Sequence, residues 1–191
     1  MYHIKDDQRS IRSAEMLYEG LEKLLQTTSF DAIKVKDLVE SSHVGRTTFY
    51  RNFDVIEDIL QFRCDQVATE LLGYLHAYHQ RHPHESDMTL LKPVLRYFYL
   101  HSELIELLIK AKRMHLFEQA LLTLFEPFKP MFGVFFGVAE DYVDYIVTVR
   151  IGSIVRILTH WVHTGKKQTP DELADELGTI IAEMVTLEQF V

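Results

Sequence analysis

The segment from Lys34 to Phe53 constrains the fold more than any other stretch, and it reads KVKDLVESSHVGRTTFYRNF. Apolar residues at helical spacing predict two short helices, with Leu38 on the inner face of the first and Phe49 and Phe53 on that of the second. Only residues 43–45 separate them. Because so short a turn cannot form a loop, the helices must cross at a steep angle. This is the helix-turn-helix pattern, whose second helix can lie in the major groove of DNA.

The side chains that this arrangement turns outward carry hydrogen-bond donors. Arg46 and Thr47 begin the second helix, where side chains reach base edges. We expect these two and Lys36 to read bases, and the others to position the DNA backbone. The predicted DNA-binding residues are Lys34, Lys36, Gly45, Arg46, Thr47, Thr48, Tyr50, Arg51 and Asn52.

The same segment resembles the DNA-binding domain of the TetR/AcrR family of bacterial regulators. The matching residues are Leu38-Val39, Ser42-His43-Val44-Gly45, Thr48-Phe49-Tyr50-Arg51-Asn52-Phe53 and Glu57-Asp58-Ile59-Leu60. The resemblance covers about the first sixty residues, and the remainder only in the layout of its helices. It implies a sequence-specific transcriptional repressor that a small-molecule inducer releases from a palindromic operator.

Three residues depart from the family pattern. His43 stands where the family has Gly, at a turn position that needs a left-handed backbone, which His tolerates better than a β-branched residue. Gly45 replaces a Ser and removes a side-chain N-cap from the second helix. Ile56 replaces a Lys that contacts phosphate. These departures leave an alternative function open, a helical dimer with a weakened DNA head that acts through protein–protein contacts.

Composition narrows the remaining classes of protein. The net charge of −8 argues against coating nucleic acid by bulk electrostatics. However, residues 33–53 hold four cations and two acids, a local net charge of +2. A polar N-terminus, a single cysteine (Cys64) and no apolar run of about 20 residues predict a cytoplasmic protein without a membrane span. We find no catalytic or nucleotide-binding motif, and therefore expect no enzyme, no cofactor and no metal site.

Helical periodicity continues to the end of the chain, without strand alternation. We predict an all-α fold of about nine helices, with a DNA-binding domain at residues 1–53 and a regulatory and dimerisation domain at 54–191, whose linking helix starts near residue 55. The Phe-rich stretch 125–136 reads as either a kinked helix or a loop. Residues 140–164 predict a long helix that Gly165 ends, and Thr169 to Glu172 form a capping box for the last helix.

The second domain supplies candidates for an effector pocket and for a dimer interface. Aromatic residues and two histidines could line an apolar pocket for an apolar or aromatic small molecule, although a filled core explains them at least as well. These candidates are Tyr74, Tyr78, Tyr97, Phe98, His101, His115 and Phe117. The last two helices carry more apolar surface than one core needs, which favours a homodimer over a helix pair buried within one subunit. The predicted interface residues are Val149, Gly152, Ser153, Trp161, Leu177 and Ile181.

Overall fold

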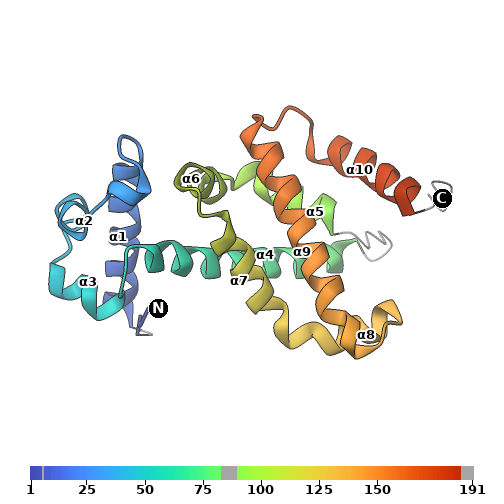
Figure 1. The fold of residues 1–191 in the computed structure, drawn as a ribbon, viewed down its shortest axis with the longest axis horizontal. Helices are drawn as coiled ribbons and strands as arrows, with labels where there is room; N and C mark the ends of the chain where they lie inside the picture. The colour runs from blue at the N-terminus through green and yellow to red at the C-terminus, as the bar shows by residue number, and fades with distance from the viewer. Residues whose placement is uncertain (6, 83–89, 186–191) are drawn as a thin grey trace. The chain divides into compact units, whose positions relative to one another are not determined.

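The computed structural model describes residues 1–5, 7–82 and 90–185, and the chain is all-α over these residues (Figure 1). This confirms the predicted fold class. The helices are α1 (Gln8–Leu25), η1 (Phe30–Ala32), α2 (Val35–Ser42), α3 (Arg46–Asn52), α4 (Glu57–Arg81), α5 (Leu91–Leu100), α6 (Glu103–Ala111), α7 (Met114–Phe125), η2 (Glu126–Phe128), α8 (Lys129–Phe136), α9 (Glu140–His163) and α10 (Pro170–Val185). The Phe-rich stretch is therefore helical, as η2 followed by α8.

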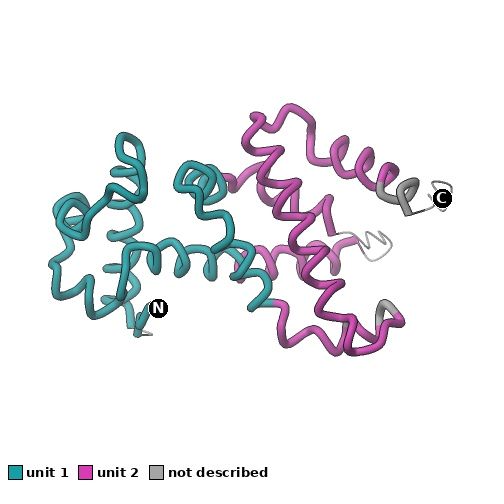
Figure 2. The backbone as a smooth tube through the Cα atoms, viewed as in Figure 1, with its two compact units in different colours: residues 1–68, 103–124 teal, residues 69–102, 125–191 magenta. Residues whose placement is uncertain are grey.

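Contacts divide the chain into two compact units (Figure 2). The first combines residues 1–68 with 103–124, and the second combines 69–102 with 125–191. Helix α4 contributes its first turns to the first unit and its later turns to the second. Neither unit ends at residue 53, because the first unit groups the helix-turn-helix with α6 and most of α7. The domain boundary that we expected at residue 53 therefore stays a prediction.

The first unit has an apolar core beneath the helix-turn-helix. Leu21, Leu38, Phe49 and Phe53 are fully buried, as their spacing predicts. The rings of Phe49 and Phe53 lie 6.2 Å apart between centroids. Phe30, the first residue of η1, is only half-buried. The buried Phe residues fix the orientation of α3, so its opposite face is turned away from the core.

Helices α1 and α2 meet in unusually close contact at Gly20. A Cβ atom placed on Gly20 would lie 2.7 Å from Ser42 Cβ and 2.9 Å from Ser42 Cα. The neighbouring Ser41 hydroxyl donates a hydrogen bond of 3.0 Å to the Gly20 carbonyl. A glycine at this position is therefore what lets α2 pack on α1.

In the second unit, ion pairs join the start of α10 to α5. The Arg96 guanidinium donates to both carboxylate oxygens of Asp171, at 2.7 and 2.8 Å. Lys92 forms a further ion pair of 2.9 Å with Asp175. Helix α9 packs on both α5 and α8, and its buried residues include Val147, Ile151 and Leu158.

Capping residues mark three helix ends, and the sequence predicted two of them, at Gly165 and at the Thr169 capping box. The Asp7 carboxylate accepts the backbone N–H groups of Arg9 and Ser10 at the start of α1. Gly165 follows the end of α9 with a left-handed backbone, φ 84°. At α10, Glu172 accepts the Thr169 backbone N–H at 2.9 Å and donates its own to Thr169 Oγ1 at 3.3 Å, which is the predicted capping box.

Candidate nucleic-acid interface

The turn between α2 and α3 has the geometry that its sequence requires. His43 ends α2 in the left-handed region, with φ 57°, which confirms the backbone conformation predicted for it. The Ser42 hydroxyl accepts the Val44 N–H at 3.3 Å, and the Val44 side chain is buried in the turn. Gly45 is the N-cap of α3 and makes no side-chain cap, as expected. The short turn between α2 and α3 thus depends on the left-handed backbone of His43, the buried side chain of Val44 and the N-cap position of Gly45.

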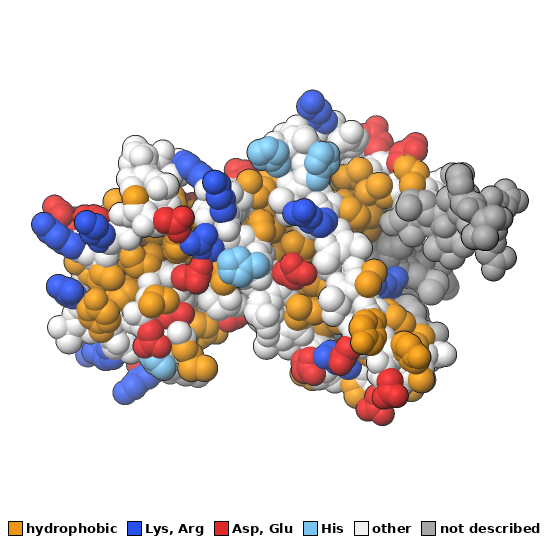
Figure 3. Space-filling model, viewed as in Figure 1, with side chains coloured by type: hydrophobic (Ala, Val, Ile, Leu, Met, Phe, Trp, Pro, Cys, Tyr) orange, Lys and Arg blue, Asp and Glu red, His pale blue; other side chains and the backbone are white. Residues whose placement is uncertain are grey.

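The outer face of α3 is polar and exposed. Arg46, Thr47, Tyr50 and Arg51 are exposed, and Thr48 is half-buried. The Arg46 guanidinium lies 5.7 Å from the centre of the Tyr50 ring, so each side chain restricts the other. Lys and Arg side chains also gather over the part of the surface that carries α1 to α3 (Figure 3). This face presents hydrogen-bond donors while the Phe residues of the same helix hold it in place.

The beginning of α2 adds two cations. Lys34 is its N-cap residue and Lys36 lies in its first turn, and both are exposed. The Asp37 carboxylate accepts the Lys34 backbone N–H at 3.1 Å. That bond secures the helix start with the backbone and leaves the lysine ammonium group outside the capping interaction.

Asn52 corrects one predicted DNA contact. Its side chain is 1% exposed, because a spacing of three residues places it on the same face of α3 as Phe49. Its Nδ2 atom has no hydrogen-bond partner among the described residues. Asn52 thus belongs to the inner face of the helix, and the periodicity that identified Phe49 as a core residue could have shown it.

A short N-terminal strap, residues 2 and 3, braces the end of α3, and sequence reasoning missed it. Tyr2 forms an isolated β-bridge with Phe53, and its hydroxyl donates a 2.7 Å hydrogen bond to the Asp65 carboxylate. The backbone N–H of His3 donates a 2.7 Å hydrogen bond to the backbone carbonyl of Asn52. Burial and the Asp65 carboxylate raise the pKa of Tyr2 to about 12. Apart from its β-branched and aromatic residues, nothing in this polar segment signals the pairing.

A second missed feature is Arg113, in the turn between α6 and α7. Its Nη2 atom lies 2.6 Å from Asp31 Oδ1, and its Nε atom lies 2.6 Å from Glu57 Oε1. The guanidinium also covers the Phe30 ring at 4.8 Å. One side chain therefore joins the α6–α7 turn to residues on either side of the helix-turn-helix. Its partners are 56 and 82 positions away, so no local pattern could reveal them.

The predicted effector residues separate into two groups. Tyr74, Tyr78, Tyr97, Phe98 and His101 pack together in the second unit, where the Tyr74 and Tyr97 ring centroids are 5.4 Å apart. His115 and Phe117 lie on α7 in the first unit, the former exposed and the latter buried. None of these residues lines the hollow of about 570 Å³ that the second unit contains.

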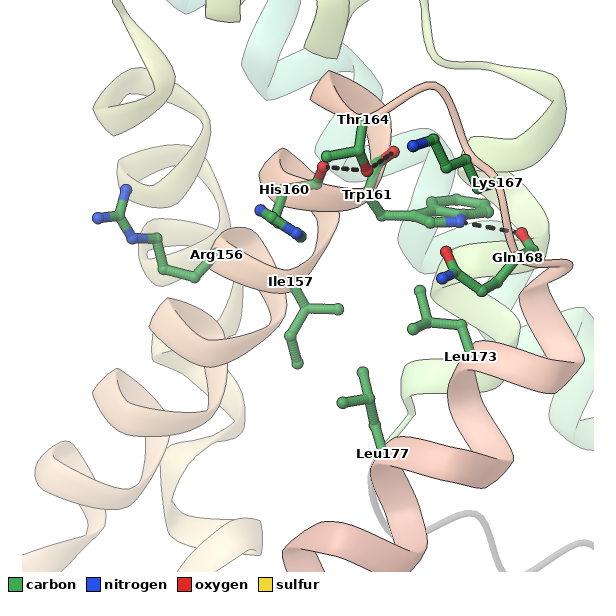
Figure 4. Close-up of a pocket in the computed structure, with 9 residues that line it drawn as sticks. All are labelled: Arg156, Ile157, His160, Trp161, Thr164, Lys167, Gln168, Leu173 and Leu177. Carbon is green, nitrogen blue, oxygen red and sulfur yellow. Dashed lines mark hydrogen bonds between the residues drawn. The ribbon is translucent and has the colours of Figure 1, made fainter.

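That hollow lies between α9 and α10 (Figure 4). Ile157, Leu173 and Leu177 face it with apolar side chains, and the Trp161 indole forms its inner wall. The Trp161 Nε1–H donates a 3.0 Å hydrogen bond to the Gln168 carbonyl. His160 and Lys167 lie at the margin, whereas the Arg156 side chain points away from the gap between the two helices (Figure 4).

The predicted dimer residues differ in exposure, and one of them is corrected by its burial. Val149 is 66% exposed, Ser153 is exposed, and Gly152 and Leu177 are half-buried; the Ile181 side chain lies outside the described residues. Trp161 is only 1% exposed and stacks on Tyr99, with ring centroids 6.2 Å apart. Trp161 is therefore a core residue of its own subunit. A charged residue there would unfold the protein instead of separating two intact subunits.

Helix α9 is also long and apolar enough to cross a membrane by length and composition alone, with a mean hydropathy of 1.2 over its most apolar window. A core or interface helix passes the same test. Its residues that face the rest of the second unit are buried, as expected for a helix of a folded core.

Comparison with known proteins adds two findings. A family model of the TetR type, described as the C-terminal region of a transcriptional regulator, matches residues 88–183, which is half of the chain. Among solved structures, the chain is similar to Lin0861 from Listeria innocua, with a TM-score of 0.74 and 18% identity over 96% of each chain. No curated protein matches it in sequence. At that identity the structural likeness concerns the fold alone, so the residue-level case rests on the α2–α3 geometry.

Proposed function

We propose the following function for this chain, which belongs to the TetR family of transcriptional regulators: it binds a palindromic DNA operator as a homodimer and represses transcription until a small molecule binds. The observation that carries the proposal is the division of α3 into two faces. Phe49 and Phe53 anchor one face in the core, while Arg46, Thr47 and Tyr50 project from the other.

The contacts that we propose follow from side-chain chemistry and position. Arg46 and Thr47, at the start of α3, read base edges together with Lys36. Arg can form a bidentate pair with guanine O6 and N7. The DNA backbone is positioned by Lys34, Thr48, Tyr50 and Arg51, and Asn52 is excluded by its burial. Open space surrounds the position where a Gly45 Cβ would lie, so this glycine allows close approach to a phosphate.

A homodimer suits this head, because two copies related by a two-fold axis read the two halves of a palindrome. The apolar exposure of α9 supports such pairing. Tyr142, Tyr145 and Val149 are each more than 60% exposed, an unusual density of large side chains facing water on one helix.

The effector that we propose is an apolar or aromatic small molecule. Tyr74, Tyr97 and His101 pack ring against ring in the second unit, and Tyr78 also receives a 2.8 Å hydrogen bond from Arg96. Such a cluster offers both aromatic surface and oriented polar groups. A ligand that fits one arrangement of the cluster better than another shifts the balance between them.

Selection of bound duplexes from a random pool, followed by a salt series, tests the proposal. We expect enrichment of one palindromic sequence and a linear fall of log affinity with log salt, because each phosphate contact releases counterions. A scrambled duplex of the same length is the control. If no sequence is enriched and the enriched and scrambled duplexes bind alike, the chain acts through protein contacts instead.

A further inference from the structure

Arg113 has a fixed backbone position between the end of α6 and the start of α7. Its N–H donates a 2.9 Å hydrogen bond to the Leu108 carbonyl, and the Lys112 N–H donates to the Ile109 carbonyl at 3.1 Å. These two bonds, with Lys112 in the left-handed region at φ 57°, form the Schellman motif that closes a helix. The Arg113 carbonyl also accepts the Leu116 N–H at 3.0 Å, in the first turn of α7. The backbone that carries the guanidinium is therefore held by both helices.

The Arg113 guanidinium contacts the chain just before α2 and just after α3. Its Nη2 atom pairs with Asp31 of η1, and its Nε atom pairs with Glu57, the first residue of α4, each at 2.6 Å. Its carbon atom lies 4.8 Å from the centre of the Phe30 ring, which also belongs to η1. One side chain thus joins the two points at which the chain enters and leaves the helix-turn-helix. All of these residues belong to the first unit (Figure 2).

The shape of the guanidinium suits it to hold an orientation. Its planar N–H groups point in fixed directions, whereas an ammonium group is a single point of charge. Two carboxylates at different edges and a ring against its face therefore constrain it from three sides. The carboxylate side chains are partly exposed, by 78% for Asp31 and 40% for Glu57, and such ion pairs add little to global stability. The cluster accordingly contributes more to geometry than to the free energy of unfolding.

A neighbouring contact between α6 and α1 is weaker. Lys110 Nζ lies 3.4 Å from the backbone carbonyl of Gln26 and 3.4 Å from its side-chain oxygen. These distances are beyond the usual range for hydrogen bonds, and Gln26 lies at the end of α1. The ion pairs of Arg113 are shorter, and they reach the helix-turn-helix from both of its ends.

An operator with two half-sites requires a defined separation between two DNA-binding heads. Half-sites lie about 34–36 Å apart, one turn of DNA, or a multiple of this distance. If the head pivots on its own subunit, only a fraction of the dimers matches both half-sites at once, and the observed affinity falls by that fraction. A single half-site makes no such demand, because one head alone binds it.

We propose that Arg113 is a positioning residue for operator binding. By joining both ends of the helix-turn-helix to the α6–α7 turn, it fixes the orientation of the head that two half-sites require, without touching DNA itself. This inference rests on the operator-binding homodimer proposed above, and it adds a residue outside the helix-turn-helix on which the recognition of paired half-sites depends.

Arg113→Met in the full chain tests the inference on three kinds of duplex. These are the selected palindrome, the same duplex with one half scrambled, and palindromes with one base pair inserted or removed at the centre. Affinity for the palindrome should fall about tenfold, as it does when about a tenth of the dimers match both half-sites. Affinity for the single half-site should stay near the native value. The variant should also discriminate less against altered spacing, since one base pair shifts the half-sites by only about 3.4 Å.

Two further variants serve as controls. Lys110→Met removes a cation from the same helix end, and it should keep the native preference for spacing. Arg46→Ala should weaken binding to the single half-site as well as to the palindrome, as expected of a residue that contacts DNA directly. Circular dichroism and the denaturation midpoint establish that each variant is folded.

Asp31→Asn and Glu57→Gln test the same contact without shortening or replacing Arg113. Each removes one ion pair and should partly relax the preference for spacing. Neither should add to the effect of Arg113→Met, because the contact is already lost there. The measured quantity is the ratio of two affinities for the same variant, which cancels the uniform gain in DNA binding that follows removal of an acidic charge.

Three results would overturn the positioning role and leave operator binding intact. They are equal losses of Arg113→Met on the half-site and the palindrome, an unchanged preference for spacing, and additive effects of Asp31→Asn or Glu57→Gln with Arg113→Met. Failure of the native chain to enrich any operator is a different outcome. It would overturn the function proposed above, and this inference with it.

Discussion

At the scale of single residues, a substitution at Gly20 tests the close packing of α1 on α2. Gly20→Ala should lower the free energy of unfolding by about 1–3 kcal/mol, because the added methyl meets the backbone of Ser42, which cannot move aside. The helix propensity of alanine offsets at most about 1 kcal/mol of this. Chemical denaturation measures the change.

Gly73→Ala is the matched control, because Gly73 also lies within a helix but no atom lies within 4 Å of its added Cβ. This variant should be slightly more stable than the native chain. Equal effects at the two glycines would contradict the close packing of α1 on α2.

A substitution of Arg46 tests whether the start of α3 contacts base edges. Arg46→Ala should reduce the discrimination between the selected operator and single-base variants by about 1–3 kcal/mol at the contacted position. Competition binding against a panel of variants measures it. Arg51→Ala should instead weaken binding equally on all sequences, and the same uniform loss for Arg46→Ala would reassign Arg46 to a phosphate contact.

At the scale of structural elements, Arg113 fastens the α6–α7 turn to η1 and to the start of α4. Arg113→Met keeps the length of the side chain but removes both ion pairs with Asp31 and Glu57. These groups are partly exposed, so the loss of global stability should be small, at most about 1 kcal/mol. Hydrogen exchange should nevertheless become faster at residues 29–33 and 111–114, because the tie between them is lost. Lys110→Met, which loses only long contacts of 3.4 Å to Gln26, should leave exchange near the native rate.

At the contact of α1 with α4, Tyr18 makes the free energy of unfolding depend on pH in the alkaline range. Tyr18 on α1 lies 5.8 Å below the Arg63 guanidinium of α4, and burial raises the pKa of Tyr18 from 10.0 to about 12. The folded protein therefore holds this proton more tightly than the unfolded chain does. The stabilisation is complete below pH 10 and is lost as pH rises from about 10 to about 12. Tyr18→Phe should make this decline shallower in denaturation curves recorded across that range, and an unchanged decline would show that Tyr18 does not titrate with unfolding.

At the scale of the whole molecule, the sequence predicted what depends on short-range chemistry. The helix-turn-helix, the left-handed His43, the Gly165 end of α9 and the Thr169 capping box each depend on residues within a few positions. The ion pairs of Arg113 and the contacts of Tyr2 depend on residues distant in the sequence, which no periodicity specifies. The α9–α10 hollow depends on how two successive helices pack, which helical periodicity also leaves open. Trp161 and Asn52 show a second kind of failure, because a residue type suited to an interface or to DNA was assigned without considering which face of its helix it occupies.

The correction at Trp161 yields the sharpest test of dimerisation. Val149→Glu places a charge on the exposed apolar face of α9, so the subunit should retain its helical circular dichroism while sedimentation shows monomers. Operator affinity should fall steeply, because each monomer holds only one half-site. Trp161→Glu should behave differently, since it buries a charge and breaks the bond to Gln168, and it should lose helical structure at ambient temperature. A folded monomer from Trp161→Glu, or an intact dimer from Val149→Glu, would show that the dimer interface does not lie on the exposed face of α9.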